Sequence, residues 1–288
     1  MKLESPEVQK ASGFVYDSPL WGTGTISKDE KSILGRKLSY CLDDLTGVRG
    51  RILEVGCARG QFIRSVKRYR SDLEAFGCDV NQAAIRLNQE EADGVSYCVG
   101  DGLQLPFPDG FFDALIMFDL LEHVEAPEQF LNEVRRVLKP GGVCHGYIPC
   151  EGEPCTLYWL LWKLRLGHNL KKKHRGHIHR FSLQDCVSLL RRTGLAPIRI
   201  RYSGYFLEQL LDILFYVSLE FKGLRDTIWQ AHASKSAPKG RDPKKNFLTR
   251  SLAMVKDAAY RVSYYETKVL APLKGLGAMG LHVTAKKE

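Results

Sequence analysis

The sequence lacks both the paired-cysteine spacing of a redox or metal motif and a long apolar run. It has no Cys-x-x-Cys pair among its eight cysteines, and no uncharged apolar run of 18 residues. Cys57, Cys78 and Cys98 fall at or near the ends of expected buried strands, which fits free thiols better than a disulfide framework. The N-terminus is polar, so neither a bilayer span nor a signal peptide is expected. We therefore expect a cytoplasmic protein, attached at most to the inner surface of a membrane.

Acidic residues are in the minority, and the excess of basic residues is concentrated in two places. The formal net charge is +9, and the basic clusters span residues 171–180 and 235–250. Coulomb attraction draws nucleic acid, anionic lipid head groups and acidic substrates alike to such clusters. Charge alone leaves these partners open, together with the simpler interpretation of two solvated loops.

A complete dinucleotide-binding motif is also missing. Residues 51–60 form an apolar strand that enters a turn hinged by two glycines. A dinucleotide turn needs G-x-G-x-x-G, and only Gly56 matches, because Ala58 and Gln61 stand at the other two glycine positions. The pattern therefore disfavours NAD as the cofactor.

The turn resembles instead the first motif of class I S-adenosylmethionine (SAM) methyltransferases, E-x-G-x-x-x-G, in which Ala often replaces the middle glycine. Later segments follow the order of that family: one strand ends at Asp79, the next is followed by Asp101, and a buried strand leads to Asp119. The combination L-P-F…F-D…L-E-H-V…L-K-P-G-G is similar to the type 11 methyltransferase subgroup.

This resemblance implies a fold and a cofactor. The fold is α/β, a Rossmann-like doubly wound sheet with an antiparallel last strand, carrying a helical insertion. The cofactor is SAM: Asp79 would accept both ribose hydroxyls, the residues from Asp101 to Leu103 would cradle adenine, and Asp119 would shape the methionine end. The implied cofactor-binding residues are Glu54, Gly56, Cys57, Ala58, Gly60, Asp79, Val80, Asp101, Gly102, Leu103 and Asp119. Each acid has an alternative explanation, because an Asp after a strand is commonly a helix N-cap.

The chain divides into four stretches. Residues 1–50 would form a lid and a helix, 51–201 the SAM-binding core, 202–276 a helical insertion between the last two strands, and 277–288 the final strand of the core. A chain of this length can hold one such core with an appendage. An insertion this long cannot be a structureless loop, so we expect helices in it.

In the first stretch, Ser27-Lys-Asp-Glu30 has the pattern of a capping box. It predicts an amphipathic helix over 28–45, beside the cofactor cleft. Residues 16–24 are aromatic and irregular, so they form either a lid over the cofactor or a surface plug.

The helix expected over 205–221 is apolar round most of its circumference. Such a surface must be covered, either by the core of the protein or by a bilayer or a lipid substrate. A second helix is expected from about 247 to 270, after a basic linker at 233–245, and the apolar run 157–162 precedes Lys163. The combination resembles that of interfacial proteins and favours a lipid-like acceptor.

Methyl transfer from a sulfonium needs alignment, exclusion of water and deprotonation of the acceptor. The candidate catalytic residues are His123, just past the fourth strand, and His179, in the connection after the fifth strand, where His177 and Arg180 are its neighbours. Histidine has a suitable ordinary pKa for this role, although each of these side chains could equally be structural.

No metal site is expected. His174, His177 and His179 follow Cys150 and Cys155 in the chain, but their spacing matches no standard zinc site. The two cysteines are not expected to act as nucleophiles either. They follow the fifth strand, whereas the nucleophilic cysteines of pyrimidine C5-methyltransferases follow the fourth.

The predicted function is SAM-dependent transfer of a methyl group to a small-molecule or lipid-linked acceptor, at an oxygen atom. Enzymes that methylate base amines of DNA and RNA carry an Asn/Asp-Pro-Pro-aromatic turn after the fourth strand, and Asp119-Leu-Leu-Glu122 stands here instead. Nucleic acid is therefore not expected as the partner. Two alternatives stay open: an RNA methyltransferase that uses the basic clusters, and a catalytically silent module that binds a membrane surface.

Overall fold

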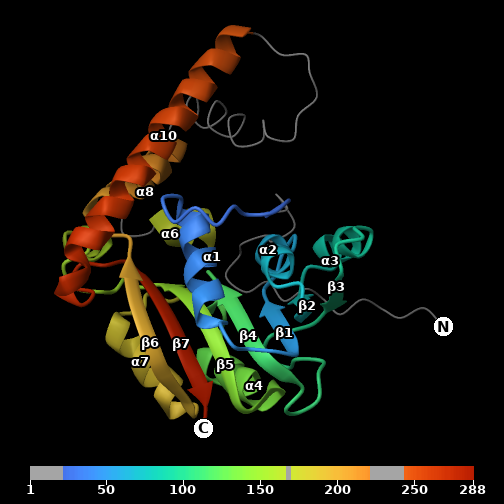
Figure 1. The fold of residues 1–288 in the computed structure, drawn as a ribbon. Coiled ribbons are helices and arrows are strands. Elements are labelled where there is room, and N and C mark those ends of the chain that lie inside the picture. The colour runs from blue at the N-terminus through green and yellow to red at the C-terminus, as the bar shows by residue number, and fades with distance from the viewer. Residues whose placement is uncertain (1–21, 167–169, 221–242) are drawn as a thin grey trace.

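A computed structural model describes residues 22–166, 170–220 and 243–288 of the chain (Figure 1). Most of the expected lid at 16–24 and of the basic linker at 233–245 lies outside these residues. Within them, no helix is both long enough and apolar enough to cross a bilayer.

The protein is built on a seven-stranded sheet in the order β3-β2-β1-β4-β5-β7-β6. Five strands are parallel neighbours, whereas β7 runs antiparallel to both β5 and β6. This is the fold class that the sequence predicted. The strands are β1 Arg51–Val55, β2 Glu74–Asp79, β3 Val95–Val99, β4 Phe112–Phe118, β5 Leu138–Pro149, β6 Leu195–Ser203 and β7 Gly280–Lys287.

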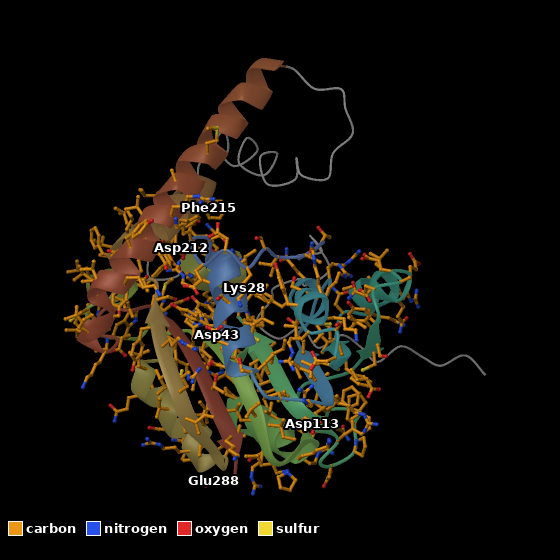
Figure 2. All side chains as sticks on the ribbon, viewed as in Figure 1. Lys28, Asp43, Asp113, Asp212, Phe215 and Glu288 are labelled. Carbon is orange, nitrogen blue, oxygen red and sulfur yellow. The ribbon has the colours of Figure 1, made fainter. Side chains whose placement is uncertain are left out.

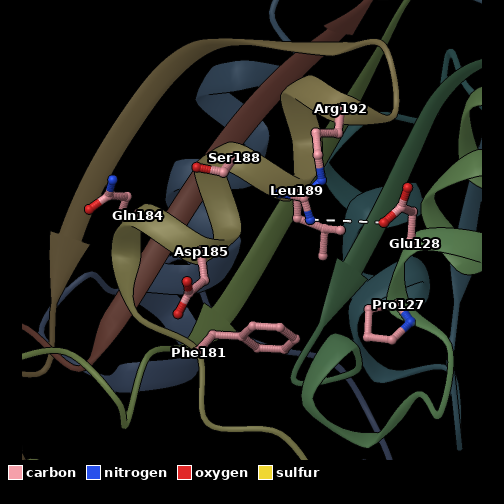
Figure 3. Close-up of a pocket in the computed structure, with 8 residues that line it drawn as sticks. All are labelled: Pro127, Glu128, Phe181, Gln184, Asp185, Ser188, Leu189 and Arg192. Carbon is pink, nitrogen blue, oxygen red and sulfur yellow. Dashed lines mark ion pairs between the residues drawn. The ribbon is translucent and has the colours of Figure 1, made fainter.

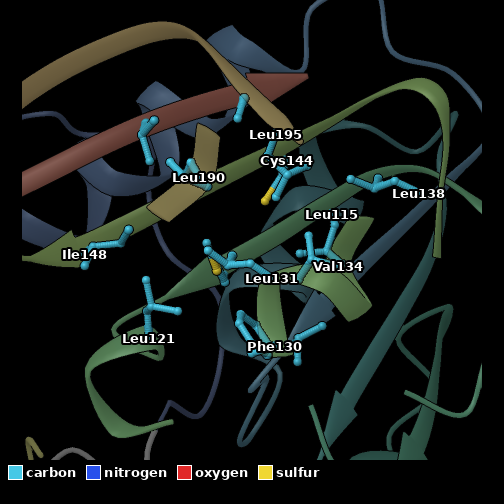
Figure 4. Packing of buried hydrophobic residues seen from close by; sticks show 14 of the residues in the cluster. Leu115, Leu121, Phe130, Leu131, Val134, Leu138, Cys144, Ile148, Leu190 and Leu195 are labelled. Atoms are coloured by element: carbon cyan, nitrogen blue, oxygen red, sulfur yellow. The ribbon is translucent and has the colours of Figure 1, made fainter. Parts of the chain in front are cut away.

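Helices cover both faces of the sheet because neighbouring strand residues point to opposite sides. Ile52 packs under α1 (Ile33–Asp44), α2 (Gln61–Tyr69) and α3 (Gln82–Gln89). Leu53 belongs to the other core, where Phe130 and Leu131 of α4 (Pro127–Val137) meet Leu190 of α7 (Leu183–Arg192). Figure 4 shows Phe130, Leu131 and Leu190 converging on the strands. The two cores hold the carboxyl ends of β1, β2 and β4 in place at one edge of the sheet.

The first helix begins later than expected. The side chain of Ser32, not of Ser27, caps α1 by accepting a hydrogen bond from the backbone N–H of Gly35 at 3.0 Å. Glu30 does not complete a capping box, because its carboxylate accepts from the hydroxyl of Ser39 instead. The prediction of helix over 28–32 was therefore wrong, since Ser32 offers a second cap closer to the apolar face that α1 buries.

The connection after β5 and the segment between β6 and β7 are helical. The first contains α5 (Leu157–Lys163) and α6 (Leu170–Arg175), and the second α8 (Phe206–Glu220), α10 (Pro243–Leu270) and the short helix η4 (Ala271–Leu273). The helices predicted near 205–221 and 247–270 are thus α8 and α10, and α10 extends well beyond the sheet (Figure 1).

These helices lie at the same end of the molecule as the carboxyl ends of the parallel strands. Figure 2 shows Asp212 and Phe215 of α8 at one end, with Asp113 at the start of β4 and Glu288 after β7 at the opposite end. Ligands of open α/β sheets bind at the carboxyl ends of the strands. Both helical segments therefore border the edge where a ligand is expected.

Candidate active site

The loop after β1 is a glycine-hinged cradle fixed to the end of β2. The N–H groups of Gly56 and Cys57 both donate to the carbonyl of Cys78, at 2.9 and 3.2 Å. Gly56 and Gly60 each have a φ of 72°, and Ala58 between them has a φ of 44°. A residue with a Cβ pays about 1–2 kcal/mol for this left-handed conformation, so the middle position carries strain in the present chain.

Asp79 ties this loop to the start of α3. Its Oδ2 accepts the N–H of Ala58 at 2.7 Å, and its Oδ1 accepts the N–H of Asn81 at 2.8 Å. Burial raises the pKa of this carboxyl more than these hydrogen bonds lower it. The helix N-cap is Asn81, whose side chain accepts from Ala84, so the N-cap explanation for Asp79 is wrong. Each carboxylate oxygen retains a further lone pair that a ribose hydroxyl could use.

Two other residues predicted to bind the cofactor lie behind the loop. Glu54 is only 3% exposed, and its Oε2 accepts the N–H of Ile63 in the first turn of α2 at 2.8 Å. Burial raises the pKa of Glu54 well above its ordinary range. The Cys57 side chain is buried as well. Both side chains therefore support the loop from the protein side, and the loop itself presents backbone.

The ends of β2 and β3 offer an open apolar edge beside a polar turn. Val80, directly after Asp79, is 53% exposed. Asp101 is exposed, and its Oδ1 accepts the N–H of Leu103 at 2.9 Å, which closes the turn. A Cβ on Gly102 would lie 2.9 Å from the ring of Phe130, so this position tolerates little beyond glycine. The arrangement suits a purine, with apolar contact to its faces and acceptors at its rim.

Asp119, after β4, is paired with a lysine that the sequence analysis did not single out. Lys37 of α1 binds the Asp119 carboxylate, and its Nζ lies 3.5 Å from the centroid of the Tyr147 ring. Burial alone would raise the pKa of Asp119, but attraction to Lys37 outweighs it and holds the pKa below its ordinary value. The helix was expected beside the cleft, yet no local pattern distinguishes Lys37 from the other basic residues of α1.

A group of buried and half-buried acids and histidines, which we call the Glu122 cluster, lies just beyond Asp119. Glu122 and His123 belong to the short helix η2 (Leu121–His123). The Nε2 atoms of His123 and His177 lie 3.7 and 3.8 Å from the same oxygen, Oε1 of Glu122, and the two rings meet edge to face at 4.8 Å. Nδ1 of His177 contacts Oε1 of Glu151 at 2.6 Å.

Burial shifts the pKa of two members of this cluster. It raises the pKa of Glu122 well above the ordinary range, and Asp119 adds to the effect. Burial also lowers the pKa of His123, to about 4, and His177 acts in the same direction. The partners Glu122 and Glu151 were missed by the sequence analysis. Glu122 adjoins His123 in sequence, but Glu151 is brought to His177 only by the fold.

The second predicted catalytic residue, His179, is held differently. Its Nε2 lies 2.9 Å from the carbonyl of Val124, and its ring stacks on Phe181 at 5.4 Å. The N–H groups of Ile178 and His179 both donate to the backbone carbonyl of Glu122. These contacts give His179 a structural task, which is to fasten its segment to η2.

Cys150 and Cys155, which precede the three histidines in the chain, do not lie beside the Glu122 cluster in one metal-binding set. Sγ of Cys150 lies 3.8 Å from Sγ of Cys186 in the core, and Cys155 is exposed.

A shallow hollow of ≈ 370 Å³ lies elsewhere, between α4 and α7. Figure 3 shows that it is lined by the exposed pair Glu128 and Arg192 and by Phe181. It contains none of the predicted site residues.

Comparison with known proteins agrees with this geometry. The class I SAM-dependent methyltransferases are defined by a sheet with an antiparallel last strand, a glycine loop after β1 and an acid at the end of β2. Residues 53–145 match the family model of the methyltransferase domain. The chain carries a methyltransferase domain of this class, and its cofactor is S-adenosylmethionine.

Curated relatives match only over the core of the chain. A fatty-acid O-methyltransferase of Mycolicibacterium smegmatis is 32% identical over 133 residues, 45% of this chain and 48% of that protein. A sterol 24-C-methyltransferase of Gibberella zeae is 32% identical over 99 residues, 32% of this chain and 26% of that protein. The chain thus spans less than half the length of these two relatives.

The fold likeness extends further than the sequence likeness. Geranyl diphosphate C-methyltransferase from Streptomyces coelicolor, solved with S-adenosyl-L-homocysteine, has a TM-score of 0.51 at 16% identity. The likeness covers 89% of this chain and 81% of that one. At this identity the likeness concerns the fold alone.

Proposed function

We propose that the chain is a methyltransferase that transfers a methyl group from SAM to a small-molecule or lipid-linked acceptor, at oxygen. The observation that carries the proposal is the Asp79 carboxylate, anchored by two backbone N–H groups at the rim of the glycine loop. In this proposal Asp79 holds the ribose, the turn from Asp101 to Leu103 holds adenine, and Asp119 with Lys37 faces the methionine end. When bound, SAM supplies a methyl group that its sulfonium has already activated.

The acceptor side is proposed to be the Glu122 cluster. Its side chains adjoin Asp119, whose pKa is lowered by the charges of Lys37, Arg175 and His177 after the opposing effect of burial. Among the two predicted catalytic residues, His123 lies in this cluster, whereas His179 is engaged with the backbone of Val124. We therefore assign the acceptor contact to His123 and not to His179.

A lipid-like acceptor is supported by apolar surface at the same edge of the sheet. Leu160 and Trp162 of α5 are 45% and 48% exposed, and Phe206 and Leu214 of α8 are 57% and 55% exposed. Exposed large apolar side chains on two helices that contact each other are what a lipid-binding surface would use. The fatty-acid and sterol methyltransferases are named for lipid acceptors, which agrees with this choice.

The basic cluster at 171–180 does not favour an RNA substrate. Lys171 is buried, and its Nζ lies 2.8 Å from Oδ2 of Asp212. Lys173 binds Glu220, and Arg175 donates to the hydroxyl of Tyr216 at 2.6 Å. These cations join α6 to α8. Because they are already paired within the protein, they are not available to bind a phosphate backbone.

The proposal is tested by incubating the protein with methyl-labelled SAM and, separately, a cell lipid extract, a polar extract and total RNA. Label is expected in the lipid extract, and Asp79→Asn is expected to reduce it strongly. Label in the polar extract alone would show that the acceptor is a water-soluble metabolite. Label in RNA would show that the basic cluster at 171–180 does not exclude an RNA substrate. Failure to bind SAM in calorimetry would favour the catalytically silent module.

We further propose peripheral contact between α5 and an anionic membrane surface. The exposed Trp162, Leu164 and Leu166 lie beside Lys163 and Arg165, which combines apolar insertion with attraction to anionic head groups. Co-sedimentation with phosphatidylserine vesicles is expected, and a Trp162→Ser/Leu164→Ser variant is expected to stay in the supernatant. Equal sedimentation of the parent and the variant would contradict the proposal that α5 contacts the membrane.

A further inference from the structure

We propose that Glu122, His123 and His177 form a binding site for a divalent first-row transition-metal ion. The starting point is the Glu122 side chain, which is 0% exposed. Neither of its carboxylate oxygens has a hydrogen-bond partner among the described residues. A buried polar group without a partner costs free energy, and a buried carboxylate costs more than most. A cation at this point would remove that cost.

The geometry brings three ligand atoms to one point. The Nε2 atoms of His123 and His177 lie 3.7 and 3.8 Å from Oε1 of Glu122, and one ligand atom from each residue lies within 4.8 Å of the others. Ligands that bind one zinc ion tetrahedrally at about 2.1 Å are about 3.4 Å apart. The two distances to Glu122 are close to this spacing, and movement of the two imidazole rings toward each other would complete the set.

Both imidazoles are oriented by contacts on their other nitrogen. Nδ1 of His177 contacts Oε1 of Glu151 at 2.6 Å, and Nδ1 of His123 lies 3.3 Å from the carbonyl of Gly176. Each of these oxygens can only accept, so the proton belongs on Nδ1 and the lone pair of Nε2 turns toward Glu122. Metal-binding histidines are held in this way by carboxylates and carbonyls.

The supporting acid has a cation beside it. Nζ of Lys171 lies 3.7 Å from Oε1 of Glu151, the same oxygen that contacts Nδ1 of His177. A carboxylate on Nδ1 strengthens a histidine as a metal ligand through Nε2. The Glu122 cluster thus has an inner set of three ligand atoms and an outer set that fixes them.

Two imidazoles and one carboxylate select zinc, manganese or iron in preference to calcium, which binds oxygen ligands. Three protein ligands leave coordination positions open for a further oxygen atom. This next step rests on the proposed function: the ion would hold a hydroxyl or carboxylate oxygen of the acceptor beside Asp119. In this arrangement His123 binds the ion and does not act as a base.

The test measures cation binding directly, without SAM and without acceptor. The full chain is first stripped of metal with a chelator and dialysed. Binding of Zn²⁺ is then measured by calorimetric titration, and binding of Mn²⁺ is measured in a parallel titration monitored by electron paramagnetic resonance. One ion per chain is expected. Glu122→Gln and His177→Asn are each expected to lower the affinity at least about 100-fold, and Glu151→Gln about 10- to 100-fold.

A matched variant separates the site from general surface binding. Glu125→Gln removes a carboxylate from an exposed position three residues away. It is expected to bind the ion as the parent chain does. Circular dichroism melting curves check that every variant is folded.

The proposal is overturned if the folded, stripped chain binds neither ion, or if Glu122→Gln binds it as tightly as the parent chain. These outcomes are independent of methyl transfer. A chain that binds no ion but labels lipid retains the proposed function, whereas a chain that binds the ion but not SAM retains the metal site.

Discussion

Arg36 of α1 and Glu208 of α8 form an ion pair inside the protein, with Nη2 of Arg36 lying 2.9 Å from Oε2 of Glu208. Their side chains are 1% and 5% exposed. Nη1 of Arg36 also donates to the hydroxyl of Thr267 in α10 at 3.0 Å. One guanidinium therefore joins the N-terminal helix to both long helices between β6 and β7, although Arg36 and Glu208 are 172 residues apart in sequence.

Removing one partner of this pair is expected to destabilise the protein strongly. Glu208→Gln leaves the Arg36 charge buried without a carboxylate, and breaking a buried pair typically costs about 3–5 kcal/mol. Urea unfolding should show this loss in the free energy of unfolding. The double variant Arg36→Met/Glu208→Leu should recover much of it, since no buried charge remains. A loss below about 1 kcal/mol for the single variant would contradict the assignment.

Asp79→Asn is expected to weaken SAM binding. An amide has one acceptor oxygen, so it cannot accept both ribose hydroxyls while it also serves the N–H groups of Ala58 and Asn81. Hydrogen bonds to charged groups contribute about 1.5–3 kcal/mol, which corresponds to about a 10- to 100-fold rise in Kd by calorimetry. Asp72→Asn is the control, because Asp72 lies before the start of β2, at the opposite edge of the sheet. An unchanged Kd for Asp79→Asn would remove the ribose assignment.

Ala58→Gly tests the strain in the glycine loop. Glycine adopts the left-handed region without a Cβ clash, so the substitution relieves up to about 1–2 kcal/mol, offset by the greater freedom of glycine in the unfolded chain. We expect a free energy of unfolding equal to or slightly above that of the parent. Ala84→Gly, inside α3, should instead cost about 1 kcal/mol. Equal losses at both positions would show that the φ of 44° at Ala58 carries no strain.

Stability in acid is expected to depend on Asp44, at the end of α1. Burial alone would raise the pKa of Asp44, but hydrogen bonds from His145, Arg201 and Thr284 outweigh it and hold the pKa well below the ordinary value. A carboxyl with a lowered pKa in the folded state stabilises the protein above its ordinary pKa. That contribution is lost as the pH falls through the lower, folded pKa.

The free energy of unfolding, measured by urea at a series of pH values, should therefore fall below about pH 4, where an ordinary Asp titrates. Asp44→Asn should be less stable at neutral pH and should show a flatter acid limb. Asp43→Asn, the preceding residue, lies on the exposed side of α1 and should keep the acid limb of the parent. Parallel acid limbs for Asp44→Asn and the parent would contradict this role.

Local patterns were sufficient for the architecture of the sheet. Apolar strands, two glycines and an acid at the end of β2 are features of neighbouring residues, and through their resemblance to a known family they predicted this sheet. The start of α1 was misplaced because two serines offered alternative caps, and only burial of the helix face selects between them. The N-cap alternative for Asp79 could be decided only when Asn81 was seen to cap α3.

By itself, the sequence determined the class of fold and, through its resemblance to a known family, the cofactor, because the strands and glycine turns that carry the resemblance are encoded within a few residues. Only the tertiary structure decided which side chains meet around Asp119 and Glu122. Lys37 reaches Asp119, and Glu151 reaches His177, through contacts between elements far apart in the chain. Burial then sets the pKa of Glu122 and of His123, and burial is a property of the packed protein, not of any segment.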